Sequence, residues 1–453
     1  MPVRPLIEGD RIPRREVQAN VEHAGTQGMR SLPEAELPDG ELPSDFIERV
    51  VALSASTIVH VPTRLRHRLA STMAATLLGM ARGNGKASTL EQARSKLLLG
   101  PVPRFRSKRK VLTERFDAWE AGQFECLLIK AEEVQFALRR QAGVNRNTQD
   151  ALSGKLRRAK QLVSNGAYSK AIAALSSELA VLTPGDEQKW VEELLPGSRF
   201  PDEALSESVD GMADRTETGS RDNTRHVLKG IRFGALSAAG PSGCRPEHLN
   251  DALSAQPRST ASRLLRAITE FNEVASVGGL ADHCRWLLGS KLVFLRKKVG
   301  NKPRPIRIGE FWRRVVAKKL VQINAATSRK IFARARQFGI SVPGGAEALI
   351  HFRTCLEDSL RTDDGPALAI LDLDLRNAFP SLEWPSIRAG VEEFMPGISG
   401  WTRWCHSSKV FVELPCGTRV WKDRGAEQGD PLGAIYCGVT IASVIHVCRE
   451  KNA

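Results

Sequence analysis

The segment 367–379, ALAILDLDLRNAF, constrains the fold of this chain more than any other stretch of its sequence. Small and apolar residues run through it, and a period of two places Asp372 and Asp374 on one face and leucines on the other. We interpret the segment as a buried strand. Asp374 near its end, followed by the aromatic ring of Phe379, suits a metal-dependent phosphoryl-transfer site. A helix cap formed by Asp374 is an equally good interpretation of this segment alone.

A second segment, 424–433 with the sequence RGAEQGDPLG, favours the phosphoryl-transfer interpretation. Gly429 permits a backbone conformation that other residues avoid, and Pro431 fixes the backbone that follows. The sequence therefore predicts a sharp loop that carries the polar Gln428 and leads into the apolar run 432–447.

Together the two segments resemble the third and fourth motifs of reverse transcriptases, particularly those of non-long-terminal-repeat retrotransposons. The first segment matches the palm motif with a metal-binding Asp and an aromatic gate, here Asp374 and Phe379. The second matches the Gln-Gly-x-Pro-Leu motif, which begins here at Gln428 and Gly429. The order and spacing of the two segments agree with this family.

The basic charge of the chain favours a polyanionic partner. Its 66 Lys and Arg against 51 Asp and Glu give a net charge of +15, although composition alone does not separate nucleic acid from an acidic membrane. Residues 291–336 hold fifteen Lys or Arg and one acid, Glu310, and so carry +14 of that charge. A solvated face would mix signs, so we predict a nucleic-acid or phosphate surface here.

The same basic region contains a predicted hairpin, formed by residues 292–295 and 302–308 around a basic turn. Proline in the second strand requires an edge position. The hairpin resembles the fingers motif centred on Arg-Pro-Ile. On that resemblance, Arg304 is the candidate for binding the triphosphate of an incoming nucleotide, because Arg offers several donors in a fixed fork. Lys302 and Arg307 are the candidate helpers.

The sequence predicts an α+β protein: a helical N-terminal region followed by an incomplete right-hand polymerase, with fingers and a partial palm and without a thumb. The turn within residues 239–249 resembles the start of the fingers in the same family. Hydrophobic periodicity and polar stretches set the expected segments. These are a disordered tail (1–44), a helical region (45–200), a linker (201–223), the fingers (224–345) and the partial palm (346–453).

The resemblance implies template-directed DNA synthesis, with an RNA template, a DNA primer and deoxynucleoside triphosphates as partners. Asp374, helped by the carbonyl of Leu375, would hold the Mg²⁺ ions that stabilise the attacking and leaving oxygens. Phe379 would crowd the 2′ position of the sugar and so favour deoxynucleotides. Gln428 and Gly429 would shape the pocket around the nucleotide.

The next motif of the family, an aromatic residue, any residue and then Asp-Asp, has no match in this sequence. After Pro431 the only acidic residue is Glu450. Two divalent ions ~4 Å apart repel by roughly 4 kcal/mol even in water, which a single carboxylate does not offset. We therefore expect a reverse-transcriptase fragment that is inactive by itself. The alternatives are a non-catalytic nucleic-acid-binding remnant and a helical interaction protein.

The remaining sequence signals bear on location. The eight cysteines include no Cys-x-x-Cys pair, which disfavours a zinc site. The N-terminus lacks the apolar core of a signal peptide. The longest apolar run, 434–447, is shorter than the ~20 residues that span a bilayer. We expect an intracellular protein, in the nucleus rather than the cytoplasm, with no membrane partner.

Overall fold

The computed structural model of this chain combines many helices with one small mixed sheet, which confirms the predicted mixture of helices and strands. It describes residues 36–103, 105–144, 184–195, 198–199, 231–234, 236–295, 303–359, 375–427 and 429–450, residue 228 and a few residues between 156 and 175. All of these residues belong to one compact unit, Glu34–Ala453.

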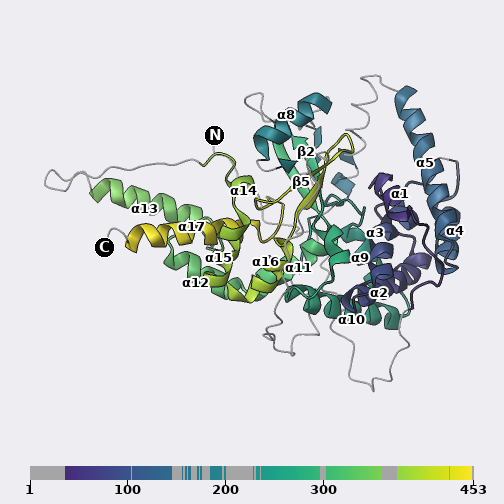
Figure 1. Ribbon diagram of the computed structural model, residues 1–453, viewed down its shortest axis with the longest axis horizontal. Helices are drawn as coiled ribbons and strands as arrows, with labels where there is room; N and C mark the ends of the chain where they lie inside the picture. Colours follow the sequence, from purple (N-terminus) through teal and green to yellow (C-terminus); the bar gives the residue numbers. More distant parts are fainter. Residues whose placement is uncertain are drawn as a thin grey trace, which may run out of the picture. The chain divides into compact units, whose positions relative to one another are not determined.

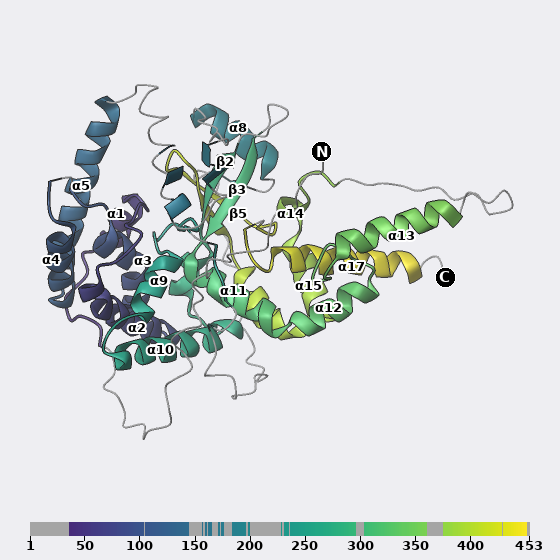
Figure 2. The ribbon, with the colours of Figure 1, turned by 180° about the vertical axis from the view of Figure 1, so that it is seen from behind.

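Helices occupy most of the described N-terminal part (Figure 1). They are α1 (Phe46–Ala52), the 3-10 helix η2 (Thr63–Leu65), α2 (Arg66–Ala81), α3 (Gly85–Leu99), α4 (Lys108–Glu120), α5 (Phe124–Val144) and α8 (Pro184–Leu194). Helix α3 begins where the side chain of Asn84 accepts a hydrogen bond from the amide of Ala87, an ordinary N-cap. Figures 1 and 2 both show α2 beside α10 (Arg258–Ser276), and the two helices are in contact.

The later part of the chain adds shorter helices around the sheet. Its helices are α9 (Pro246–Leu253), η5 (Asp282–Leu288), α11 (Phe311–Ile323), α12 (Ala325–Arg334), α13 (Gly345–Ser359), α14 (Ala378–Ser381), α15 (Trp384–Phe394), η6 (Pro396–Ile398), α16 (Ser399–Cys405) and α17 (Gly433–Glu450). Its strands are β1 (Ser198–Arg199), β2 (Ser290–Leu295), β3 (Arg304–Gly309), β4 (Val410–Glu413) and β5 (Arg419–Lys422).

The sheet has the strand order β1-β5-β4-β2-β3. Two antiparallel hairpins, β2 with β3 and β4 with β5, are joined by the parallel pair β2 and β4. The β2–β3 hairpin is where the sequence predicts one. Strand β3 lies at the edge of the sheet, which gives Pro305 a place where a missing N–H donor is tolerated.

Helix α8 covers one face of this sheet. Its residues Val191 and Leu194, with the following Leu195, pack against Leu292 and Phe294 of β2 and against buried residues of β4 and β5. Strand β1, just after α8, pairs with β5. The end of the predicted N-terminal helical region therefore packs with the strands of the predicted fingers and palm.

The main hydrophobic core also runs across the predicted segment boundaries. It includes Phe46 of α1, Phe271 of α10, Trp312 of α11 and Val439 of α17. The core contains a buried ion pair, in which Nη2 of Arg94 lies 2.6 Å from Oε1 of Glu91. The indole N–H of Trp312 donates to the same carboxylate at 2.6 Å, so α3 and α11 share one polar contact inside the core.

The Gly-Pro-Ser-Gly turn at residues 240–243 is bound to the start of α11. The amide and hydroxyl of Ser242 donate to the two carboxylate oxygens of Glu310 at 2.7 and 2.6 Å. A Cβ at Gly240 would lie 2.8 Å from the Cα of Glu310, so only glycine fits this close approach. The turn has a structural role in this contact.

Burial raises the pKa of Glu310 to about 7. Because the unfolded chain ionises this carboxyl near 4.5, Glu310 stabilises the fold below that pH, and the contribution is lost as the pH rises through about 7.

We expect Glu310→Gln to remove about 3 kcal/mol of the pH dependence of the free energy of unfolding between pH 4.5 and about 7. Urea unfolding of both proteins at several pH values measures it. Burial lowers the pKa of the neighbouring Lys96 to about 8, so this amine titrates above the window. Identical pH profiles would refute the assignment.

Candidate nucleotide and nucleic-acid site

Three segments singled out by their sequence meet in the structure. The amide of Ala426 donates to the carbonyl of Phe379 at 2.8 Å, and the amide of Gly425 donates to the carbonyl of Leu382 at 2.6 Å. Nη2 of Arg307 donates to the carbonyl of Ala426 at 2.7 Å. Strand β3, the segment 375–382 and the loop 423–433 are therefore direct neighbours.

The predicted site residues differ in how they are placed. Asp374, Asp372, Lys302 and Gln428 lie outside the described residues. Of the others, Arg304 and Gly429 are exposed, Leu375 is 60% exposed and Phe379 is half-buried. The ring of Phe379 approaches the start of α17, where its Cε1 would lie 3.7 Å from a Cβ at Gly433.

Arg307 has a different environment from Arg304. Its side chain is 4% exposed, its Nη1 lies 3.6 Å from Oε1 of Glu427, and its Nη2 contacts the loop carbonyl described above. Burial lowers the pKa of Arg307. In the structure Arg307 contacts the loop and anchors it. A contact between Arg307 and a nucleotide stays a prediction.

Sequence reasoning missed the residue that holds this loop most directly, Arg313 of α11. Its Nη1 donates to Oε1 of Glu427 at 3.1 Å, and its Nη2 lies 2.8 Å from Oδ2 of Asp430. All three side chains are buried. Burial acts to raise the pKa of Glu427, but the charges of Arg313 and Arg307 outweigh it and lower that pKa. The signal in the sequence is the pair of acids flanking Gln428, which need a buried cation if the loop is packed.

The described cations of the basic segment 291–336 differ in exposure. Arg307, Arg313 and Lys319 are buried, and Lys291, Arg314 and Lys318 are half-buried. The exposed cations among its described residues are Arg304, Arg329, Lys330, Arg334 and Arg336, most of them on α12 or just after it. Among the described cations of this segment, the exposed group is the most accessible to phosphates.

The three segments pack closely where they meet. A cavity of about 10 Å³ remains between Leu195, Pro305, Arg307, Pro380 and Ala426. This is about the space of one water molecule. A nucleotide bound at this junction therefore lies on its surface.

The described residues do not fit a site for two Mg²⁺ ions. No group of three or more His, Cys, Asp or Glu side chains within them is arranged to hold a metal. Two carboxylates of the loop, Glu427 and Asp430, are buried against Arg313. No helix in the described part of the chain is long and apolar enough to cross a membrane.

Gly425 provides a test of the contact between the loop and segment 375–382. Its φ is +83°, and a Cβ there would lie 2.4 Å from the carbonyl oxygen of Pro380. We expect Gly425→Ala to lower the free energy of unfolding. The clash with Pro380 should add roughly 1–3 kcal/mol to the loss that backbone strain alone causes. Gly417→Ala is the matched control, because Gly417 has a φ of +95° with no atom within 4 Å of its Cβ position. Equal losses in thermal unfolding would mean that the close approach is absent.

Comparison with protein-family models and curated proteins identifies no relative of this chain. No protein-family model matches the chain, and no curated protein matches its sequence.

Proposed function

We propose that this chain contains the fingers and the first part of the palm of an RNA-directed DNA polymerase of the non-long-terminal-repeat retrotransposon kind. We further propose that it binds a hybrid of RNA template and DNA primer. The observation that carries the proposal is the convergence of β3, segment 375–382 and loop 423–433 through the contacts of Ala426, Gly425 and Arg307. These segments are far apart in the sequence, and the resemblance to reverse transcriptases requires them to be neighbours.

The proposed binding surface is formed by the exposed cations of β3 and α12. Arg304 begins β3 at the sheet edge, opposite Leu295, with its side chain exposed. A guanidinium in this position is suited to two oxygens of a triphosphate or of the nucleic-acid backbone. Leu375, Phe379 and Gly429 are the described residues of the proposed nucleotide pocket.

The activity proposed for this chain is binding without nucleotidyl transfer. Asp374 is the one carboxylate proposed to contact Mg²⁺. Glu427 and Asp430 neutralise Arg313 and Arg307 inside the protein and are not free to take its place. Nuclear nucleic acid is the proposed partner.

Removal of the Arg304 and Lys302 side chains tests the binding surface. We expect the double substitution Arg304→Ala with Lys302→Ala to weaken binding of an RNA–DNA hybrid at low salt and to have less effect at high salt. For each phosphate that the variant no longer neutralises, the slope of log affinity against log salt should fall by about 0.7–0.9. Fluorescence anisotropy with a labelled hybrid over a salt series measures both quantities.

The matched control removes two exposed cations elsewhere, Arg109→Ala with Lys110→Ala on α4. This variant loses the same charge from outside the proposed surface. If both double variants reduce the affinity and the slope equally, binding depends on net charge and the proposed surface is rejected.

A further inference from the structure

Helix α5 carries a line of side chains, exposed except for the half-buried Cys126, that no part of the proposed nucleic-acid surface uses. Cys126, Ile129, Glu133, Phe136 and Arg140 follow one another at alternating intervals of three and four residues, which places them on one face of a helix. Ile129 is 42% exposed and Phe136 is 65% exposed. We call these five residues the α5 seam. Exposed apolar residues at this spacing are typical of a helix that pairs with another helix.

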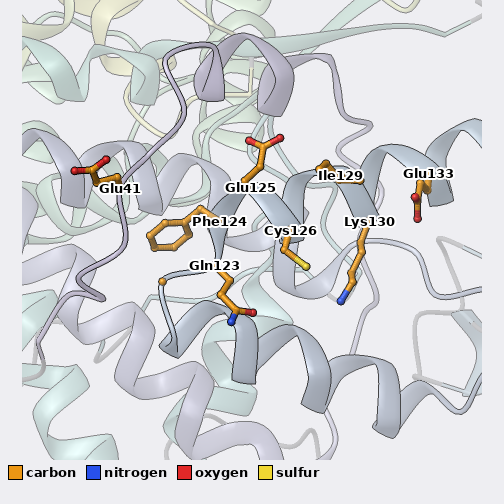
Figure 3. A pocket seen from close by; sticks show the side chains of 9 residues that line it. Glu41, Gln123, Phe124, Glu125, Cys126, Ile129, Lys130 and Glu133 are labelled. Atoms are coloured by element: carbon orange, nitrogen blue, oxygen red, sulfur yellow. The ribbon is translucent and has the colours of Figure 1, made fainter.

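A groove opens at the beginning of the α5 seam (Figure 3). Its volume is about 570 Å³, and Phe124, Cys126 and Ile129 form part of its lining. Its other lining residues are Glu41, Gly122, Gln123, Glu125, Lys130 and Glu133. The groove therefore has an apolar side and an excess of carboxylates.

Charge is distributed unevenly along α5. Glu125, Glu132 and Glu133 lie in its first half with a single cation, Lys130, and Arg139 and Arg140 lie further along. Only part of the acidic charge is neutralised within the chain, because Arg49 pairs with Glu125 at 2.9 Å and with Glu132 at 2.8 Å. One end of the helix is therefore complementary to the other end of an identical helix that runs in the opposite direction.

We propose that α5 pairs antiparallel with α5 of a second copy of this chain. Ile129 of each copy then faces Phe136 of the other, and Arg140 of each copy lies at the acidic groove of the other. A two-fold axis relates the two copies, so each of these contacts occurs twice. The seam is short compared with the roughly 20–30 residues a side of a standard interface. We therefore expect a weak, reversible dimer.

Sedimentation of the full chain over a concentration series tests the pairing. The unaltered protein should shift from monomer to dimer as its concentration rises. Phe136→Asp should weaken the dimer by more than about tenfold. Leu138→Asp is the matched control, because Leu138 is 42% exposed on the opposite face of the same helix, and it should leave the dimer unchanged. An unaltered protein that stays monomeric, or equal effects of the two variants, would overturn the proposal.

A cross-link tests the direction of the pairing. In the antiparallel arrangement Cys126, a free thiol, lies beside residue 140 of the second copy. Under mild oxidation, Arg140→Cys should give a disulfide-linked dimer that disappears when Cys126→Ser is added. Leu138→Cys should give no linkage to Cys126. A link that forms equally from both positions, or one that survives Cys126→Ser, would exclude this arrangement.

Discussion

Glu91→Ala is expected to lower the free energy of unfolding by about 3–5 kcal/mol, because it leaves a buried cation without its partner. Arg94 is fully buried, and both of its ion-pair contacts are with the Glu91 carboxylate. The same change removes the acceptor of the Trp312 indole N–H, which has no solvent to replace it. The substitution therefore removes the polar contact between α3 and α11 inside the core.

Chemical unfolding of the purified chain measures this loss. The matched control is Glu120→Ala, which removes one partner of an ion pair with Arg68 at 2.6 Å. Half of the Glu120 side chain is exposed, and such surface pairs contribute about 0–1 kcal/mol. Similar losses in the two variants would show that the Glu91–Arg94 pair is solvated in solution and does not connect α3 to α11.

Arg313→Met is expected to lower the free energy of unfolding by a similar amount, about 3–5 kcal/mol, because it leaves Glu427 and Asp430 buried near each other without their main counter-ion. Arg307 compensates in part, since its guanidinium is 3.6 Å from Glu427. We expect the loop 423–433 to open before the rest of the protein unfolds. Hydrogen exchange of the loop amides, with urea unfolding of the whole chain, separates local from global loss.

Neutralising the two acids provides the control for Arg313→Met. The triple variant Arg313→Met with Glu427→Gln and Asp430→Asn should recover part of the lost stability, because uncharged amides are less costly to bury than unpaired carboxylates. Recovery would assign the loss to charge. A triple variant as unstable as Arg313→Met alone would assign it to the missing packing of the Arg313 side chain.

Local sequence signals predicted the local structure well. The β2–β3 hairpin follows from the basic turn between two predicted strands, and the edge position of β3 follows from Pro305. The covering of the sheet by α8 was not predicted. Helical periodicity shows that α8 has an apolar face, but it does not identify the sheet that this face meets.

Charge patterning predicted the site only in part. A count of cations in 291–336 does not distinguish Arg304, which is exposed, from Arg307 and Arg313, which are buried. The distinction depends on Glu427, 114 residues after Arg313, and the acids around Gln428 do not identify which cation of 291–336 they pair with. The structure shows that segment 375–382 and loop 423–433 meet, whereas the key predicted residues Asp374 and Gln428 lie outside the described residues. Nucleotide and Mg²⁺ contacts of these segments stay predictions.

The most direct test of this account is photo-cross-linking of the full chain to an RNA–DNA hybrid with a photoreactive nucleotide at the primer terminus. Mass spectrometry then identifies the cross-linked residues. We predict cross-links to β3, to segment 375–382 and to loop 423–433, the three segments that the contacts of Ala426 and Arg307 bring together. Cross-links confined to α4, α5 or other parts of the chain outside these segments would contradict a polymerase-like site.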